Sequence, residues 1–215
     1  TEADRMYQPV FSVQGLPGAV YEITAAEDII TPDGTTRYGK GEIVDTVTTD
    51  KTGLAESKPL YLGKYEIREI KAPYGMVLNT DIRTAELVYA GQEIEITETS
   101  ASFYNERQKA AVSLNKVLEQ NAKFGIGTNG EISAVTFGLF ATEDLTAADG
   151  SVIPTDGLLE ILSVDENGHA VCNTDLPFGS FYLGELSTDE HYILSDEKHP
   201  IVFDYAGQDT ALVEI

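Results

Sequence analysis

The sequence contains one cysteine, three histidines and no tryptophan among its 215 residues. Cys172 therefore has no partner for an internal disulfide. Neither a C-x-x-C pair nor a histidine-rich cluster is present to hold zinc. We expect no metal and no cofactor, and the folded state must be stabilised by other means.

Basic residues are scarce as well, because 14 Lys and Arg stand against 36 Asp and Glu, a formal net charge of -22. This charge repels phosphate backbones and anionic lipid headgroups, which argues against nucleic-acid binding and membrane contact by this segment. No run reaches the roughly 18 apolar residues of a membrane-spanning helix. Thr1–Gln14 lacks the basic start and the apolar stretch of a signal peptide. We expect targeting signals to lie outside this segment.

The chain contains an internal repeat at an offset of 116 residues, or 115 for one turn. Four matches in the same order argue against chance. With the length of the chain, they predict two domains of about 100 residues each, 1–108 and 109–215. The matching pairs are Tyr89–Gln92 with Tyr205–Gln208, Tyr65–Glu69 with Phe181–Glu185, Ala19–Tyr21 with Val135–Phe137, and the turn Asp50–Gly53 with Asp165–Gly168.

Apolar residues alternate with polar or smaller ones at a period of two, which is typical of half-buried strands. Turn residues such as Pro32-Asp33-Gly34 separate the alternating runs. About seven short strands per repeat predict an all-β fold of two tandem antiparallel β-sandwich domains. The runs include Val112, Leu114, Lys116 and Leu118, then Tyr65, Ile67 and Glu69, and also Leu87, Tyr89, Ile94 and Ile96.

Four polar residues fall on the apolar face of these strands. The alternation places Glu69, Glu185, Lys116 and Asn105 among inward-facing neighbours. A lone buried carboxylate or amine costs several kcal/mol, or it neutralises. One explanation is that each side chain sits at a strand end and reaches solvent. The recurrence of the glutamate across the repeat favours a functional role.

The run Tyr65-x-Ile67-x-Glu69-x-x-Ala72-Pro73-x-Gly75 resembles the penultimate strand of the Cna B-type (SpaA-like, prealbumin-like) domains of Gram-positive surface adhesins and pilins. Val112-x-Leu114-x-Lys116 resembles the first strand of these domains, and Phe103-Tyr104-Asn105 their last. The resemblance covers the chain twice, although the second copy lacks the Ala-Pro-x-Gly turn. It implies an isopeptide bond between a first-strand Lys and a last-strand Asn, assisted by the Glu.

The chemistry of such a bond can be stated independently. An amine attacks only when it is neutral, and burial in apolar surroundings favours the neutral form. A protonated carboxyl in the same pocket can polarise the asparagine carbonyl and carry protons until ammonia leaves. The fold supplies proximity, worth roughly 7 to 11 kcal/mol of barrier. The reaction turns over once on its own chain, so we expect no enzyme in the usual sense.

Each repeat lacks one partner of the bond. At the offset of 116, the position matching Lys116 is residue 0, and the position matching Asn105 is residue 221. We therefore expect a truncated first strand in the first domain and a truncated last strand in the second. If the longer protein supplies both residues, each domain closes a loop of about 105 residues and two ammonia molecules are lost.

The resemblance implies a structural stalk or adhesin module of an extracellular, cell-wall-anchored bacterial surface protein, whose anchor and signal peptide we expect to lie elsewhere. Its partners would be adjacent repeats of the same protein. The alternative is a ligand-binding module for a host extracellular protein or glycan, without crosslink chemistry. A hydrolase with an acidic pair is disfavoured, because no second core-facing carboxylate accompanies Glu69 or Glu185.

Overall fold

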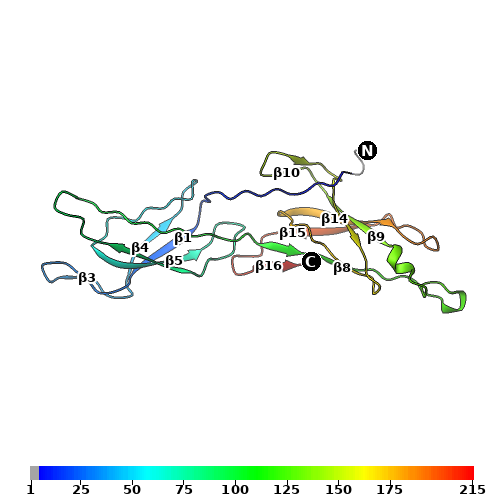
Figure 1. Cartoon of the computed structure of the whole chain (residues 1–215), viewed down its shortest axis with the longest axis horizontal. Helices are drawn as coiled ribbons and strands as arrows, with labels where there is room; N and C mark the ends of the chain where they lie inside the picture. Colours follow the sequence, from blue (N-terminus) through cyan, green and yellow to red (C-terminus); the bar gives the residue numbers. More distant parts are fainter. Residues whose placement is uncertain (1–4) are drawn as a thin grey trace. The chain divides into compact units, whose positions relative to one another are not determined.

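The computed structural model describes residues 5–215, and these residues fold mainly into β-strands and loops (Figure 1). Two short 3-10 helices occur, and the described residues contain no α-helix, so the all-β prediction is confirmed. The elements are β1 (Val20–Ala25), β2 (Ile29–Ile30), β3 (Thr36–Tyr38), β4 (Ile43–Thr48), β5 (Gly63–Lys71), β6 (Ile82–Leu87), β7 (Lys109–Ala111), β8 (Ser113–Asn115), η2 (Ala122–Phe124), η3 (Glu131–Ala134), β9 (Thr136–Ala141), β10 (Leu145–Thr146), β11 (Val152–Ile153), β12 (Leu158–Ser163), β13 (His169–Val171), β14 (Gly179–Ser187), β15 (Lys198–Phe203) and β16 (Leu212–Glu214).

The chain forms two compact units, which are described separately. The main division falls between Gln108 and Lys109, and each unit also takes a short segment from the other side of it. We call residues 13–108 with 207–211 the first domain, and residues 5–12, 109–206 and 212–215 the second domain.

Hydrogen bonds explain both exchanged segments. The buried side-chain amide of Gln108 donates to the carbonyl oxygens of Gly207 (3.1 Å) and Thr210 (2.5 Å), which ties residues 207–211 to the first domain. The Tyr7 amide donates to the Leu158 carbonyl at 2.8 Å, and the Tyr7 side chain packs against the core of the second domain. Residues 5–12 therefore belong to the second domain.

The first domain is built on an antiparallel sheet in the order β4-β1-β5-β6, with β2 and β3 forming a separate hairpin. Alternation along β5 buries Tyr65 and Glu69 and leaves Glu66 and Arg68 outside. Tyr65 packs with Ile23 of β1 and Val44 of β4, so the core lies on one face of the sheet.

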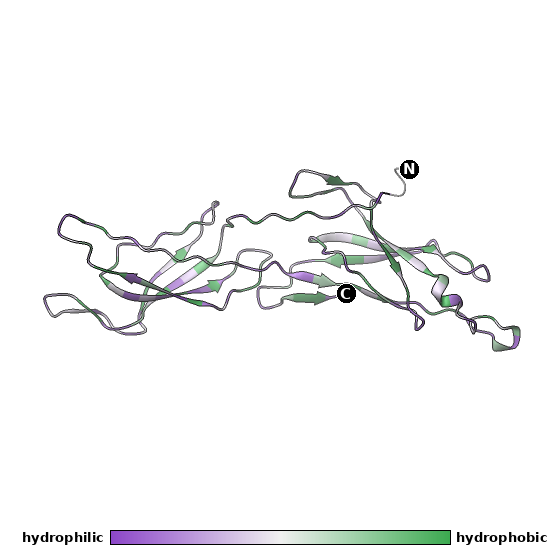
Figure 2. Cartoon of the chain, viewed as in Figure 1, coloured by the Kyte–Doolittle hydropathy of each residue, from purple (hydrophilic) through white to green (hydrophobic). Residues whose placement is uncertain are grey.

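The second domain repeats this sheet in the order β12-β9-β14-β15. Strands β9, β14 and β15 begin 116 residues after β1, β5 and β6, and β12 begins 115 residues after β4. Three two-stranded pairs accompany the sheet, namely β10-β11, β13-β8 and the parallel pair β16-β7. In Figure 2 the long strands of this domain are largely white to green, which is the range from intermediate to hydrophobic.

The core of the second domain is the larger of the two. It includes Leu139 of β9 and Phe181 of β14, which are fully buried. Val112, just before β8, is also buried, so the first strand of this domain packs on the main sheet.

Two predicted strands are wrong. Residues 103–105, expected as the last strand of the first domain, form no strand, and Asn105 is half-buried rather than buried. The alternation of Ile94 and Ile96 suggested a strand, but the structure has a turn and irregular chain there. Ile94 is 51% exposed and Ile96 69% exposed. An alternating pattern becomes a strand only where a neighbouring strand accepts its hydrogen bonds, and none pairs with residues 93–97 among the described residues.

Candidate functional site

The second domain brings Lys116 and Glu185 together. Lys116 directly follows β8, and its backbone amide donates to the Gly168 carbonyl at 2.7 Å, which fixes the position of the lysine backbone. Its Nζ lies 2.9 Å from Oε1 of Glu185 on β14. Glu185 is 8% exposed, and the Lys116 side chain is 23% exposed. The alternation correctly placed the glutamate on the buried face, whereas the lysine is half-buried.

The surroundings of Glu185 hold its carboxylate in place. Oε2 accepts a hydrogen bond from the Ser195 amide at 2.8 Å. Phe137 of β9 is the cross-strand partner of Glu185, and Lys116 Nζ lies 5.9 Å from the centre of its ring. The charged pair is thus bounded by an aromatic face and a backbone donor.

The first domain brings Glu69 and Asn105 together. Glu69 of β5 is 5% exposed, and its Oε2 accepts hydrogen bonds from the Asn79 amide and from Asn105 Nδ2, both at 2.7 Å. Asn105 Nδ2 also donates to the Val77 carbonyl at 2.9 Å. The amide nitrogen of Asn105, which is the leaving group of an isopeptide reaction, therefore faces the carboxylate. The sequence predicted that the glutamate would contact the asparagine side-chain carbonyl and polarise it. That contact requires the opposite orientation of the Asn105 side-chain amide.

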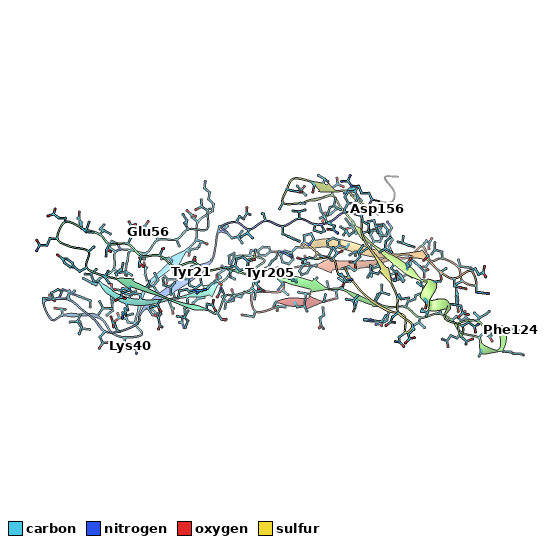
Figure 3. All side chains as sticks on the ribbon, viewed as in Figure 1. Tyr21, Lys40, Glu56, Phe124, Asp156 and Tyr205 are labelled. Atoms are coloured by element: carbon cyan, nitrogen blue, oxygen red, sulfur yellow. The ribbon has the colours of Figure 1, made fainter. Side chains whose placement is uncertain are left out.

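Glu69 also has an aromatic neighbour on the adjacent strand. Its second oxygen, Oε1, is buried. Tyr21 of β1, labelled in Figure 3, is the cross-strand partner of Glu69. Burial in the first place, and the adjacent Glu69 carboxylate in the second, raise the pKa of Tyr21 to about 12. A side-chain hydrogen bond between Tyr21 and Glu69 contributes to the same shift, so the neutral Tyr21 hydroxyl is a donor to this carboxylate.

The two sites share one plan. Glu69 and Glu185 are 116 residues apart, as are Asn79 and Ser195, and in both domains the backbone amide of the latter residue binds Oε2 of the former. The site in the first domain contains the asparagine, Asn105, and the site in the second domain contains the lysine, Lys116. The described residues bring no lysine to Glu69 and no asparagine to Glu185.

The structure identifies the residue that takes the place of the lysine in the first domain. A Cβ on Gly168 would lie 2.1 Å from the Lys116 carbonyl oxygen. A Cβ on Gly53, the counterpart of Gly168, would lie 2.5 Å from the Gly15 Cα. Gly15, rather than residue 0, therefore stands at the lysine position.

An insertion explains why the uniform offset missed Gly15. The stretch between Lys116 and β9 contains η2 and η3 and is 15 residues longer than the stretch between Gly15 and β1. A gapped comparison of Phe11-Ser12-Val13-Gln14-Gly15 with Val112-Ser113-Leu114-Asn115-Lys116 would have found it.

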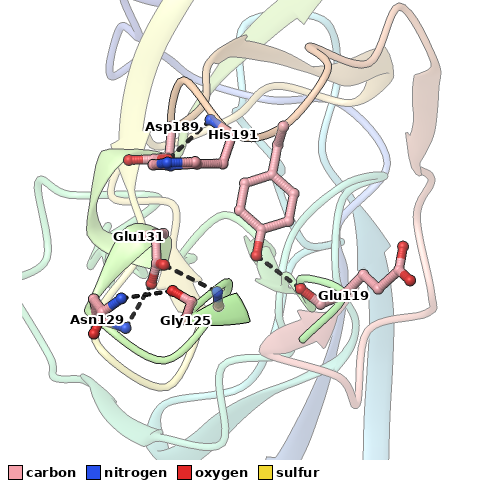
Figure 4. A network of polar contacts seen from close by, with 8 residues as sticks. Glu119, Gly125, Asn129, Glu131, Asp189 and His191 are labelled. Carbon is pink, nitrogen blue, oxygen red and sulfur yellow. Dashed lines mark hydrogen bonds and ion pairs between the residues drawn. The ribbon is translucent and has the colours of Figure 1, made fainter. Parts of the chain in front are cut away.

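The insertion has its own polar network (Figure 4). The Glu131 carboxylate accepts hydrogen bonds from the amides of Gly127 (2.9 Å) and Asn129 (2.7 Å), and backbone amides, its own first, lower the pKa of Glu131. The Tyr192 hydroxyl donates to the Glu119 carbonyl at 2.7 Å. An open pocket beside Lys116 is lined in part by this insertion. The network fixes the loop next to the lysine.

Metal-binding clusters and membrane-spanning helices are both absent from the described part of the chain. Residues 5–215 contain no cluster of His, Cys, Asp and Glu that could hold a metal ion. No helix in that range is long and apolar enough to cross a membrane.

Comparisons with known proteins agree with the fold. Residues 12–101 match the SpaA family, a prealbumin-like fold domain. The trypsin-resistant surface T6 protein of Streptococcus pyogenes is 29% identical over 148 residues, which are 67% of this chain and 26% of that protein. The Bacillus anthracis TIE protein is 19% identical with a TM-score of 0.56, over 98% of this chain and 32% of that one.

The chain thus spans about a quarter to a third of the length of these relatives. The likeness to the Bacillus anthracis protein shows the fold alone. Together with the sheet order described above, the comparisons establish an all-β, prealbumin-like architecture, with the SpaA family match lying on the first domain.

Proposed function

We propose that this chain is a structural stalk or adhesin module of a Gram-positive cell-surface protein, made of two tandem SpaA-like domains. The first domain matches the SpaA family, and the relative from Streptococcus pyogenes is a surface protein by name. The strand order of the first domain recurs in the second at offsets of 116 and 115 residues, which supports a second copy there. The partners are adjacent repeats of the same protein, and the location is extracellular and attached to the cell wall.

In this proposal, Lys116 forms an isopeptide bond with an asparagine of the last strand of its domain, near residue 221 by the repeat offset. The observation that carries the proposal is the contact of 2.9 Å between Lys116 Nζ and the buried Glu185 Oε1. A lysine paired with a glutamate inside a sandwich costs more than an apolar pair of similar volume. A covalent role accounts for its presence.

The atoms balance as follows. Glu185 takes a proton from the Lys116 ammonium, and the free amine attacks Cγ of the asparagine. The Cγ–Nδ2 bond breaks as the new Cγ–Nζ bond forms, and Glu185 gives its proton to the departing nitrogen, which leaves as ammonia. The second proton of Nζ then passes to Glu185, which ends neutral beside the new amide. By analogy with a disulfide, closing a loop of about 100 residues is worth roughly 4.7 kcal/mol, and an amide resists reduction. Such a bond suits a stalk whose described cysteine is a free thiol.

The test is the intact mass of a protein that carries residues 1–215 and the next few dozen residues of its natural sequence. We expect the loss of one ammonia, assigned by peptide mapping to Lys116. Glu185→Ala should abolish the loss, and Glu190→Ala, at an exposed glutamate of the same domain, should not. An unchanged mass with the asparagine present would instead favour a ligand-binding module without crosslinks.

A further inference from the structure

Two loops meet at the end of the second domain where β9 begins and β14 ends. We call residues 117–134, which include the insertion, and residues 188–197 together the tip loops. The Tyr192 hydroxyl donates to the Glu119 carbonyl at 2.7 Å, which joins the two loops. A Cβ on Gly127 would lie 2.8 Å from the Glu119 carbonyl oxygen and 2.9 Å from the Tyr192 hydroxyl, so the loops pack tightly at this glycine.

Hydrogen bonds within the tip loops hold them in a defined conformation (Figure 4). The buried Glu131 carboxylate accepts the backbone amides of Gly127 and Asn129. Asn121 and Ile126 exchange backbone hydrogen bonds of 2.8 and 3.1 Å, which close a small hairpin. A loop that is ordered before it binds a partner loses less conformational entropy on binding.

Apolar side chains project from these ordered loops into solvent. Val117 is 84% exposed, Phe124 71% and Ile193 95%, and Leu194 is half exposed. Phe124, labelled in Figure 3, lies in the hairpin formed by residues 121–126. A cavity of about 570 Å³ opens beside Val117 and is lined in part by the insertion. Exposed apolar side chains that gather on one surface, aromatic ones in particular, are typical of sites that bind other proteins.

The sandwich itself does not require the insertion. The stretch between Gly15 and β1 in the first domain is 15 residues shorter than the stretch between Lys116 and β9, yet the main sheets of the two domains have the same strand order. Loops that vary on a constant scaffold are the usual carriers of binding function. The exposed apolar residues of the insertion therefore indicate binding rather than folding.

The charge around these apolar side chains is mostly negative. The tip loops carry six acidic residues and one lysine, Lys123. Glu119 and Glu190 are both exposed. The hydrogen bond to Asp189 in the first place, and the charge of Glu190 among the smaller causes, raise the pKa of His191. A surface with this charge attracts cationic partners and repels anionic ones.

We propose that the tip loops bind a basic segment of another protein, in which lysine or arginine residues flank a few apolar residues. Phe124 and Ile193 contact the apolar side chains, and Glu119 and Glu190 pair with the cationic ones. A second copy of this chain is a poorer partner, because two surfaces with the same negative charge repel each other. This binding function goes beyond the stalk role and involves no covalent step, so it does not depend on the chemistry of Lys116.

The test measures the fluorescence anisotropy of a labelled peptide, Lys-Lys-Leu-Phe-Leu-Lys-Lys, titrated with chain 1–215. We expect saturable binding that weakens about 5-fold between about 50 and 300 mM salt, because salt screens the ion pairs. The peptide Lys-Lys-Ser-Ser-Ser-Lys-Lys should bind roughly 10-fold more weakly, since it lacks the apolar anchors. The peptide Glu-Glu-Leu-Phe-Leu-Glu-Glu should not bind. Hydrogen exchange in the tip loops should slow when the first peptide is bound.

Variants of apolar residues distinguish the tip loops from other exposed apolar positions. Phe124→Ser combined with Ile193→Ser should weaken binding of the first peptide roughly 10-fold. Val152→Ser combined with Val202→Ser is the matched control, because both valines are about half exposed and lie in the same domain outside the tip loops. This control should leave the affinity unchanged.

Variants of acidic residues distinguish the tip loops from the overall charge of the chain. Glu119→Gln combined with Glu190→Gln should weaken binding about 5-fold and reduce its salt dependence. Glu143→Gln combined with Glu214→Gln removes the same charge from exposed positions outside the tip loops, and should have little effect.

Three results would overturn the proposal. The first is no binding of the basic peptide, and the second is an equal effect of the tip-loop variants and their controls. The third is a dimer of chain 1–215 that Phe124→Ser with Ile193→Ser abolishes, which would assign the surface to a second copy. The mass of the longer protein at Lys116 is measured separately, so this proposal and the crosslink can fail independently.

Discussion

Gly168 lies against the end of β8, where its carbonyl accepts the Lys116 amide at 2.7 Å and a Cβ on it would lie 2.1 Å from the Lys116 carbonyl oxygen. Its φ of +81° is in the left-handed region. A side chain at this position would therefore both strain the backbone and push the lysine strand away from the turn. The glycine lets the lysine backbone sit close enough for Nζ to reach Glu185.

Gly168→Ala should destabilise the second domain by roughly 3 kcal/mol, because the strain of a positive φ adds to a clash with backbone atoms. Gly150→Ala is the matched control. Gly150 has a φ of +83° but open space around its Cβ position, so only the strain of about 1 kcal/mol applies. Urea unfolding of the two variants measures the difference. Equal losses would show that the contact with Lys116 is unimportant.

Lys116→Met should lower the free energy of unfolding of the second domain by about 3 kcal/mol in chain 1–215. The substitution leaves the buried Glu185 carboxylate without its cation, and removing one partner of a buried pair costs roughly 3 to 5 kcal/mol. The partial exposure of Lys116 puts the value at the low end. The double variant Lys116→Met with Glu185→Gln should recover part of the loss, because it removes the unpaired charge.

Lys64→Met supplies the comparison for a surface pair. Lys64 and Glu86 are about half exposed and 4.0 Å apart, so the loss should stay below about 1 kcal/mol. Thermal unfolding of the three variants distinguishes the cases. If Lys116→Met costs no more than Lys64→Met, the pair with Glu185 is not a buried interaction in solution.

The alternation of residues in the sequence predicted which side chains within a strand are buried. The alternation of Tyr65, Ile67 and Glu69 placed the glutamate on the buried face, because side-chain direction in a strand depends only on the parity of the position. The same parity failed for Ile94 and Ile96, which have strand-like alternation but no partner strand. Whether a segment pairs depends on residues far away in the sequence.

The other differences between prediction and structure concern contacts between segments that lie far apart in the sequence. The uniform offset put the missing lysine before Thr1, because the 15 extra residues before β9 leave the later strands in register and displace only the first. The docking of residues 5–12 on the second domain rests on two backbone hydrogen bonds and one half-buried tyrosine. Nothing in the periodicity of those residues indicates which domain they join.

Glu160→Gln should destabilise the second domain at pH 7 by roughly 1.5 to 3 kcal/mol, since hydrogen bonds to a charged group are lost. The Glu160 carboxylate accepts the Thr174 amide at 2.8 Å, the Asn173 amide at 3.0 Å and the Cys172 thiol at 3.0 Å. Burial alone would raise its pKa, but these hydrogen bonds outweigh it and lower the pKa to about 2.

The pH dependence follows from the sign of that shift. A depressed carboxyl pKa stabilises the folded state above the ordinary value of 4.5, and this stability is lost as the pH falls toward 2. The difference in unfolding free energy between wild type and Glu160→Gln should therefore shrink over that range. Glu166→Gln, at an exposed turn residue, should change stability by less than about 0.5 kcal/mol at any of these pH values. A difference that does not vary with pH would contradict the assignment.

Tyr7→Ala should destabilise the second domain, although Tyr7 precedes the first domain in the sequence. Its amide donates to the Leu158 carbonyl at 2.8 Å, and its ring packs on the core of the second domain. Truncation of a half-buried aromatic ring should cost about 2 kcal/mol, less than the 3 to 5 kcal/mol of a fully buried one. Hydrogen exchange should become faster in β12, which contains Leu158, and remain unchanged in β1 and β5 of the first domain. Val13→Ala, at a residue 83% exposed, should change neither domain. Faster exchange in β1 and β5 after Tyr7→Ala would instead place residues 5–12 on the first domain, because loss of the ring would then loosen the sheet that contains those two strands.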